Sequence, residues 1–183
     1  MPTSVDQTNG IGGLKVVAVE NEEVRLTVLP GLGAKIYDIV HKSSGRNVLW
    51  HNPRISPRPV PFGSRFDDVW SGGWDEIFPN DAESVVSGEH YPDMGEIWPL
   101  EWGCDVSASD DTVTVVTAVR SPITPAEFRR TLSVRSGVPG FDLDYRITNI
   151  GKNPIHFLWK IHPAFDINRD CSIEIPAGRG KGR

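Results

Sequence analysis

Three features of the sequence predict an antiparallel, all-β chain. Short runs rich in β-branched residues recur along it, and clusters of Gly, Pro, Asn and Asp separate them. No window of a dozen residues has the 3.6-residue apolar period of an amphipathic helix. The chain also holds 18 glycines and 15 prolines in 183 residues, an abundance typical of many turns. We therefore expect residues 1–183 to form a single β-sandwich domain.

The predicted strands form two groups, one before and one after a proline-rich middle. The first group is Leu14–Val19, Glu23–Leu29, Ala34–Val40 and Asn47–Trp50. The second group is Thr112–Arg120, Glu127–Arg135, Gly140–Asn149 and Pro154–His162. Turn signals such as Ser43-Ser44-Gly45 separate successive runs, as expected for hairpin connections.

The last predicted strand has two chemically different faces. Side chains alternate across a strand, so one face carries His156, Leu158, Lys160 and His162, and the other carries Phe157, Trp159 and Ile161. We expect the second set in the core. The first set places a lysine and two histidines on one surface, which favours a functional face over a merely solvated one.

Residues 51–103 differ from the rest of the chain. They contain seven prolines and four of the six tryptophans, and we expect ordered loops over one face of the sheets with a short strand at Glu96–Asp105. Tryptophans pack in cores and also stack on the apolar faces of sugar rings, and composition alone leaves both alternatives open.

Composition excludes several classes of protein. Lys and Arg number 19 against 24 Asp and Glu, a net charge of −5 that disfavours nucleic acid as a partner. No apolar run reaches the roughly 18 to 20 residues of a membrane-spanning helix, and the N-terminus lacks the pattern of a secretory signal. We therefore expect a cytoplasmic protein, with Cys104 and Cys171 reduced and semi-buried.

No metal or cofactor is expected. The two cysteines have no paired spacing. His156 and His162, six residues apart on one strand, would lie roughly 20 Å apart, too far to share an ion.

The segment Gly63–Asp81 has the composition of a sugar site. Its charged residues, among them Arg65, Asp75 and Glu76, alternate with aromatic residues such as Trp74. Carboxylates accept hydrogen bonds from hydroxyl groups while rings cover C–H faces. A structured acidic loop is the alternative reading.

Four segments taken together resemble the galactose mutarotase-like superfamily, and within it the aldose 1-epimerase-related branch. They are Leu29–Ile36, Gly72–Pro79 (GGWDEIFP), Gly95–Trp102 (GEIWPLEW) and Trp159–Phe165 (WKIHPAF). The resemblance implies a large antiparallel β-sandwich, or supersandwich, with a concave face that binds a small-molecule carbohydrate.

The resemblance also implies a mechanism without a cofactor. Mutarotases open the pyranose ring by protonating the ring oxygen while a base takes the proton of the anomeric hydroxyl. His162 matches the family's histidine acid, and a histidine suits a proton that must be given and recovered. The implied substrate-binding residues are Arg65, Trp74, Asp75, Glu76, His90, Glu96, Trp98 and Lys160.

The sequence departs from the family pattern at two places. Met94 stands where members often have a second histidine, which leaves His90 as a substitute. The family's base is a glutamate in a C-terminal half that this chain does not contain, so we expect an incomplete sandwich and homo-oligomers formed through exposed sheet edges. Three hypotheses follow: an aldose 1-epimerase-like isomerase, a non-catalytic carbohydrate-binding module, and a structural fragment with a vestigial site.

Overall fold

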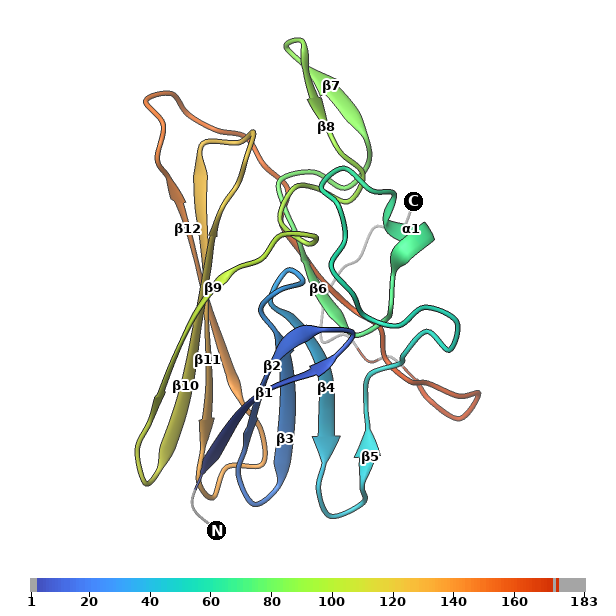
Figure 1. Cartoon of the computed structure of the whole chain (residues 1–183), viewed down its shortest axis with the longest axis vertical. Helices are drawn as coiled ribbons and strands as arrows, with labels where there is room; N and C mark the ends of the chain where they lie inside the picture. The colour runs from blue at the N-terminus through green and yellow to red at the C-terminus, as the bar shows by residue number, and fades with distance from the viewer. Residues whose placement is uncertain (1–2, 173, 175–183) are drawn as a thin grey trace.

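Two antiparallel sheets pack face to face as a β-sandwich (Figure 1). The computed structural model describes residues 3–172 and 174. Within them the first sheet has seven strands in the order β1-β2-β3-β4-β6-β13, with β5 beside β4, and the second has four in the order β12-β11-β10-β9. The all-β fold class predicted from the sequence is confirmed.

The strands have the following bounds. The first sheet contains β1 (Ser4–Ile11), β2 (Leu14–Glu20), β3 (Val24–Leu29), β4 (Lys35–His41), β5 (Arg46–Asn47), β6 (Trp74–Ile77) and β13 (Lys160–Pro163). The second sheet contains β9 (Gly103–Ala108), β10 (Thr112–Arg120), β11 (Ala126–Arg135) and β12 (Asp142–Asn149). A separate hairpin of β7 (Ser84–Val86) and β8 (Glu89–Tyr91) projects from one end of the sandwich (Figure 1).

The core lies between the sheets because each strand turns alternate apolar side chains inward. Val17, Leu26, Val28 and Ile36 of the first sheet are fully buried with Phe128 of the second sheet. Three aromatic or aliphatic residues from the connecting segments complete this core: Phe78, Ile97 and Trp102.

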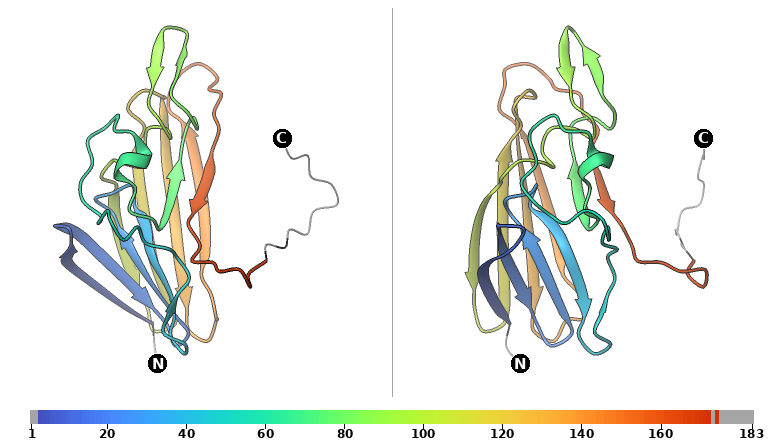
Figure 2. Two further views of the ribbon diagram at one scale, coloured as in Figure 1. Left: turned by 90° about the vertical axis from the view of Figure 1, so that its right-hand side faces the viewer. Right: turned by 45° about the vertical axis from the view of Figure 1, so that its right-hand side comes forward.

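A second apolar cluster covers the other face of the first sheet. The short helix α1 (Phe66–Val69) and its flanking loops lie on the side away from the second sheet (Figures 1 and 2). Phe66 and Trp98 pack there on Ile77 of β6. Among the described residues, no helix has the length and apolar character needed to cross a membrane.

The structure differs from the sequence-based prediction at several elements. It adds β1, α1, β6, β7 and β8, which lack a clear apolar period. The predicted strand Glu96–Asp105 is wrong over residues 96–102, because strand pairing begins only at Gly103, where β9 starts. Residues 96–102 are irregular because they serve packing: Trp98 and Trp102 are buried on different clusters, and Pro99 lacks a backbone donor.

The last strand is shorter than predicted, and its apolar face is not in the core. β13 begins at Lys160, and Phe157, Trp159 and Ile161 are 48%, 37% and 44% exposed. The reason is topological. Within the described residues β13 is an edge strand that pairs with β6 alone, and β12 is the matching edge of the second sheet. Self-association through these edges stays a prediction.

Candidate functional site

The pairing of β6 with β13 sorts the predicted site residues onto two faces. His162 lies directly opposite Asp75, and Lys160 lies opposite Ile77, so these four point to the outer face under α1. Glu76 alternates with Asp75 and points between the sheets. Two consecutive acids of one motif therefore have different surroundings.

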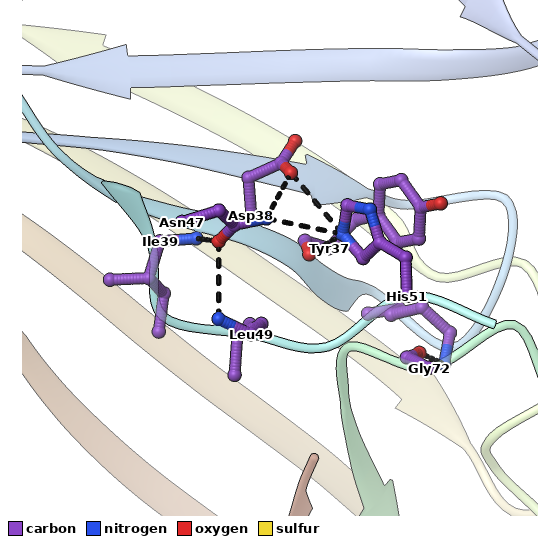
Figure 3. Close-up of polar contacts among 8 residues, drawn as sticks. Tyr37, Asp38, Ile39, Asn47, Leu49, His51 and Gly72 are labelled. Carbon is purple, nitrogen blue, oxygen red and sulfur yellow. Dashed lines mark hydrogen bonds and ion pairs between the residues drawn. The ribbon is translucent and has the colours of Figure 1, made fainter. Parts of the chain in front are cut away.

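A polar cluster of Tyr37, Asp38, Asn47 and His51 holds the loop that leads to β6 in place. The rings of Tyr37 and His51 stack with centroids 3.8 Å apart, and His51 Nε2 lies 2.8 Å from the carbonyl oxygen of Tyr37 (Figure 3). Asn47 donates from Nδ2 to Asp38 Oδ1 at 2.8 Å. His51 also forms an isolated β-bridge with Gly72. The cluster thereby joins β4 and β5 to the turn before β6.

Gly72 is required at this turn by backbone geometry. Its φ is 81°, and a Cβ would lie 2.3 Å from the carbonyl oxygen of Trp50. The carbonyl oxygen of Gly72 accepts a hydrogen bond from Lys35 Nζ at 2.7 Å. The glycine pair of the GGWDEIFP motif therefore shapes a turn that holds a buried lysine.

Lys35 and Asp75 form a buried ion pair on the outer face. Lys35 Nζ lies 2.6 Å from Asp75 Oδ2, with the two side chains 2% and 1% exposed. Trp70 Nε1 donates to the same oxygen at 3.0 Å. Burial lowers the pKa of Lys35, and the charge of Asp75 opposes that shift. Asp75 Oδ1 is buried without a hydrogen bond to any described residue.

His162 sits half-buried against two aromatic rings. Its centroid is 5.4 Å from that of Phe66 and 5.2 Å from that of Trp70, both edge-on. Nδ1 is enclosed without a hydrogen bond to the described residues, which leaves Nε2 on the accessible side of the ring. Burial lowers the pKa of His162, an effect that Asp75 opposes and Lys160 reinforces. The neutral imidazole therefore predominates at neutral pH.

Lys160 lies beside His162 on the same face, as the strand alternation predicts. Its Nζ pairs with Asp81 Oδ1 and lies 3.9 Å from the sulfur of Met94. The methionine at the departure from the family pattern thus contacts a cation near the histidine. His156, predicted on this face, lies outside β13 and is exposed.

Glu76 forms a second buried ion pair between the sheets. Its Oε1 lies 3.2 Å from Arg130 Nη1 and accepts the Tyr145 hydroxyl at 2.7 Å, and its Oε2 accepts Trp159 Nε1 at 3.1 Å. Burial and the adjacent Glu76 charge raise the pKa of Tyr145, which keeps its hydroxyl protonated as a donor. Arg130 also binds the carbonyl oxygen of Ala34. Glu76 therefore joins the two sheets.

Glu96 is likewise committed to the fold. It is fully buried, and its carboxylate accepts hydrogen bonds from the Ser121 and Thr124 hydroxyls at 2.7 Å each. The backbone amides of Ile123 and Thr124 donate to it as well. These donors occupy the acceptor positions that a sugar hydroxyl would need.

The remaining candidates are dispersed. His90 is exposed on the β7–β8 hairpin, where it pairs with Glu83 at 2.7 Å, so it does not substitute for a histidine at the position of Met94. Trp98 is only 3% exposed, and Arg65 is exposed before α1. Trp74 lines an open hollow of about 510 Å³ at the edge of the sandwich, together with Leu143, Tyr145, Trp159, Lys160 and Ile161.

Lys35, Trp70 and Arg130 are site residues that sequence reasoning missed. Arg130 had a detectable signal, since it occupies an inward position between Phe128 and Leu132 in an otherwise apolar alternation. No group of three His, Cys, Asp or Glu residues that could hold a metal ion occurs in the described part of the chain. Cys104 is half-buried as expected, whereas Cys171 is exposed.

Comparison with known proteins establishes the fold and no more. A protein-family model described as "Domain of unknown function (DUF5107)" matches residues 8–90. No curated protein matches the chain. Among solved structures, the Slr1438 protein from Synechocystis sp. PCC 6803 aligns with a TM-score of 0.63 and 17% identity, over 84% of this chain and 55% of that one.

Two other solved structures align with lower TM-scores. A TPR-domain containing protein from Parabacteroides distasonis aligns with a TM-score of 0.48 and 21% identity, over 73% of this chain and 20% of that one. Galactose 1-epimerase from Lactobacillus acidophilus NCFM aligns with a TM-score of 0.44 and 12% identity, over 73% of this chain and 44% of that one. The chain therefore spans 55% or less of each, and its likeness to the Slr1438 protein is one of fold.

Proposed function

We propose that this chain provides the sugar-binding face and the proton-transferring histidine of an aldose 1-epimerase-like isomerase. The observation that carries the proposal is the half-buried imidazole of His162, packed against Phe66 and Trp70 on the sheet face that holds Asp75. An aromatic wall beside a titratable group suits a sugar, which presents C–H faces and a rim of hydroxyls.

In the proposed reaction, His162 transfers a proton to the ring oxygen while the bond from C1 to that oxygen breaks. A base takes the proton of the anomeric hydroxyl, and an aldehyde forms at C1. Rotation about C1–C2 and the reverse proton transfers close the ring on its other face, so His162 recovers its proton. Because burial lowers the pKa of His162, its acid form is scarce at neutral pH. The exchange rate should therefore rise as the pH falls toward that pKa.

Neither acid of the GGWDEIFP motif is a ready base for this reaction. Asp75 and Glu76, the acids of the motif, are each held in a buried ion pair, with Lys35 and Arg130 respectively. Removing a proton from a hydroxyl would require either acid to leave its cation in a dry interior, which is costly.

An anionic substituent is a second element of the proposed substrate class. Lys160 is 32% exposed beside His162, and its partner Asp81 is 53% exposed, so their ion pair is open to solvent and to competition. A sugar phosphate offers oxygens that could replace the Asp81 carboxylate. Aldose phosphates therefore belong in any substrate panel.

The test is anomer exchange measured by proton NMR on aldoses and aldose phosphates. We expect exchange faster than the buffer background, with a loss of at least about tenfold in His162→Ala. His156→Ala is the matched control because His156 is an exposed histidine six positions earlier, and it should keep the wild-type rate. Equal rates for both variants would contradict the assignment of His162.

A non-catalytic carbohydrate-binding module is the second candidate, and the ion pairing of both motif acids favours it. The two functions differ in how substitutions act. In an isomerase, His162→Ala should abolish exchange while sugar binding, followed by calorimetry, largely survives. In a binding module, no variant changes an exchange rate, and Trp70→Ala should weaken binding because it removes the ring beside His162.

A further inference from the structure

The edge of the second sheet at β12 is the most regular strand edge of the sandwich. Proteins protect such edges with irregular pairing, short strands or proline. At the two ends of the first sheet, β1 has a register shift between Asn9 and Ile11, and β13 has four residues and ends at Pro163. β12 has eight residues without glycine or proline, and among the described strands it pairs with β11 alone, without a register shift. Its outward backbone groups are therefore a template for another strand.

Apolar side chains line the inner side of this edge. Leu143 and Tyr145 of β12 face an open hollow of about 510 Å³, and Trp159 and Ile161 also line it. The side chains of Trp159 and Ile161 are 37% and 44% exposed. Exposed apolar surface that is contiguous in this way marks interaction sites. A strand added to β12 with its own apolar face turned inward would extend the core over this hollow.

Two charges on the outer side of β12 have no partner among the described residues. Asp144 and Arg146 are exposed, and neither forms an ion pair or a side-chain hydrogen bond with a described residue. Arg146 lies directly opposite Arg129 of β11, and like charges in this position destabilise a sheet. An acid on the other side of Arg146 would relieve this unfavourable pair.

We propose that β12 is a dimer interface, at which a second copy of this chain adds its own β12 in antiparallel pairing about a twofold axis at Tyr145. Asp144 then lies opposite Arg146 of the second copy, and Arg146 lies opposite Asp144 of that copy. Directly opposed side chains of an antiparallel pair have Cβ atoms roughly 4.5 to 5.5 Å apart, which suits an ion pair. The acid of the second copy thereby lies on the side of Arg146 away from Arg129.

The sequence of β12 favours this register and this partner. Pairing about Tyr145 places Leu143 opposite Ile147 of the second copy, so apolar side chains also meet on the inner face. A twofold axis at Asp144 or at Arg146 would instead put two like charges in direct opposition. Because an acid and a base lie at equal distances on either side of Tyr145, the strand is complementary to itself, and a second copy fits it without any further partner.

The interface is independent of the proposed isomerase. It lies at the edge of the second sheet, whereas His162 lies on the outer face of the first sheet under α1. Dimerisation can therefore be tested in the absence of any sugar.

The test begins with the oligomeric state of the wild-type chain and of charge variants, measured by analytical ultracentrifugation. The wild type should show a concentration-dependent dimer. Asp144→Arg opposes two arginines on each side of the axis, and the dissociation constant of the dimer should rise by at least about tenfold. Arg146→Asp should have the same effect by opposing two acids. Asp105→Arg is the matched control because Asp105 is an exposed acid on β9, the other edge of this sheet, and it should keep the wild-type dimer.

Two complementation measurements are specific to the proposed register. The double variant Asp144→Arg with Arg146→Asp exchanges the two charges and should dimerise again. A mixture of the two single variants should form a heterodimer, because one copy then presents two arginines and the other presents two acids at these positions. Native mass spectrometry identifies the heterodimer by its mass.

Hydrogen exchange of the wild-type chain keeps the proposal testable even if a variant does not fold. Amides of residues 142–149 should become protected as the concentration rises and the dimer forms. A chain that stays monomeric at every concentration overturns the proposal and leaves this edge to a strand of another polypeptide. A dimer without that protection, or one that Asp144→Arg and Asp105→Arg affect equally, also overturns it, because its interface then lies elsewhere.

Discussion

Glu76 and Asp75 are neighbours on opposite faces of β6, and their carboxylates differ in how many of their oxygens accept hydrogen bonds. Glu76 faces the interior of the sandwich and accepts from Arg130, Tyr145 and Trp159, so both of its oxygens are used. Asp75 faces α1. Its Oδ2 accepts hydrogen bonds from Lys35 and Trp70, whereas its Oδ1 accepts none from any described residue. A carboxylate whose two oxygens both accept hydrogen bonds is held in one position, whereas a buried carboxylate oxygen without a donor calls for an explanation, of which a catalytic role is one. The difference supports a structural role for the inner face and the proposed functional role for the outer face.

The largest effect should follow from breaking the inner ion pair. Arg130→Met removes the cation between the sheets and leaves Glu76 charged and buried, so we expect the free energy of unfolding to fall by about 3–5 kcal/mol. Urea denaturation followed by tryptophan fluorescence measures this change. Arg129→Met is the matched control because Arg129 is the adjacent, exposed arginine, and it should change stability by less than about 0.5 kcal/mol. Similar losses for both variants would contradict the role given to Glu76.

Breaking the outer ion pair should cost less stability and change the site more. Lys35→Met leaves Asp75 buried with only Trp70 as a donor, and we expect a loss of about 3 kcal/mol. The pKa of His162 should rise, because Lys35 is a positive charge that lowers it and Asp75 is then no longer neutralised. An NMR titration of the histidine signals measures the shift.

Lys15→Met provides the control for this titration. Lys15 is an exposed lysine of β2, and its removal should leave the pKa of His162 in place. A His162 pKa that falls in Lys35→Met would mean that the two residues are not coupled through the outer face as described.

The fold was largely predictable because its longer strands have residue types that are typical of strands. Residues 126–135 largely alternate apolar and polar side chains, residues 14–20 and 112–120 are rich in valine, and all three segments form strands close to their predicted bounds. β1 escaped detection because its sequence, SVDQTNGI, is mostly polar and pairs along an edge. The last strand was predicted too long because its apolar side chains suggest a core position in the sequence. Only the topology shows that no described strand covers that face.

The site was predictable in its histidine and motif acids but not in their partners. His162 and Asp75 were named from the sequence, and the register brings them together. Lys35 lies 40 positions from Asp75 and Arg130 lies 54 from Glu76, distances at which no local pattern indicates contact. Glu96 was expected to bind a sugar because it lies in the GEIWPLEW segment. Only its hydrogen bonds to residues 121–124 show that it has a structural role.

The smallest effect should appear in the part of the pH dependence of stability that comes from His162. The pKa of His162 in the folded chain lies below its unfolded value, so between the two values the unfolded chain binds more protons. Stability should consequently fall as the pH drops from about 6.5 toward the folded pKa and stay unaffected by this group at higher pH. Urea unfolding from about pH 7.5 to 5 should show a smaller loss in His162→Gln than in the wild type, whereas the exposed control His156→Gln should follow the wild type. A larger loss in His162→Gln would reverse the sign and would place a net negative environment, rather than burial, in control of the imidazole.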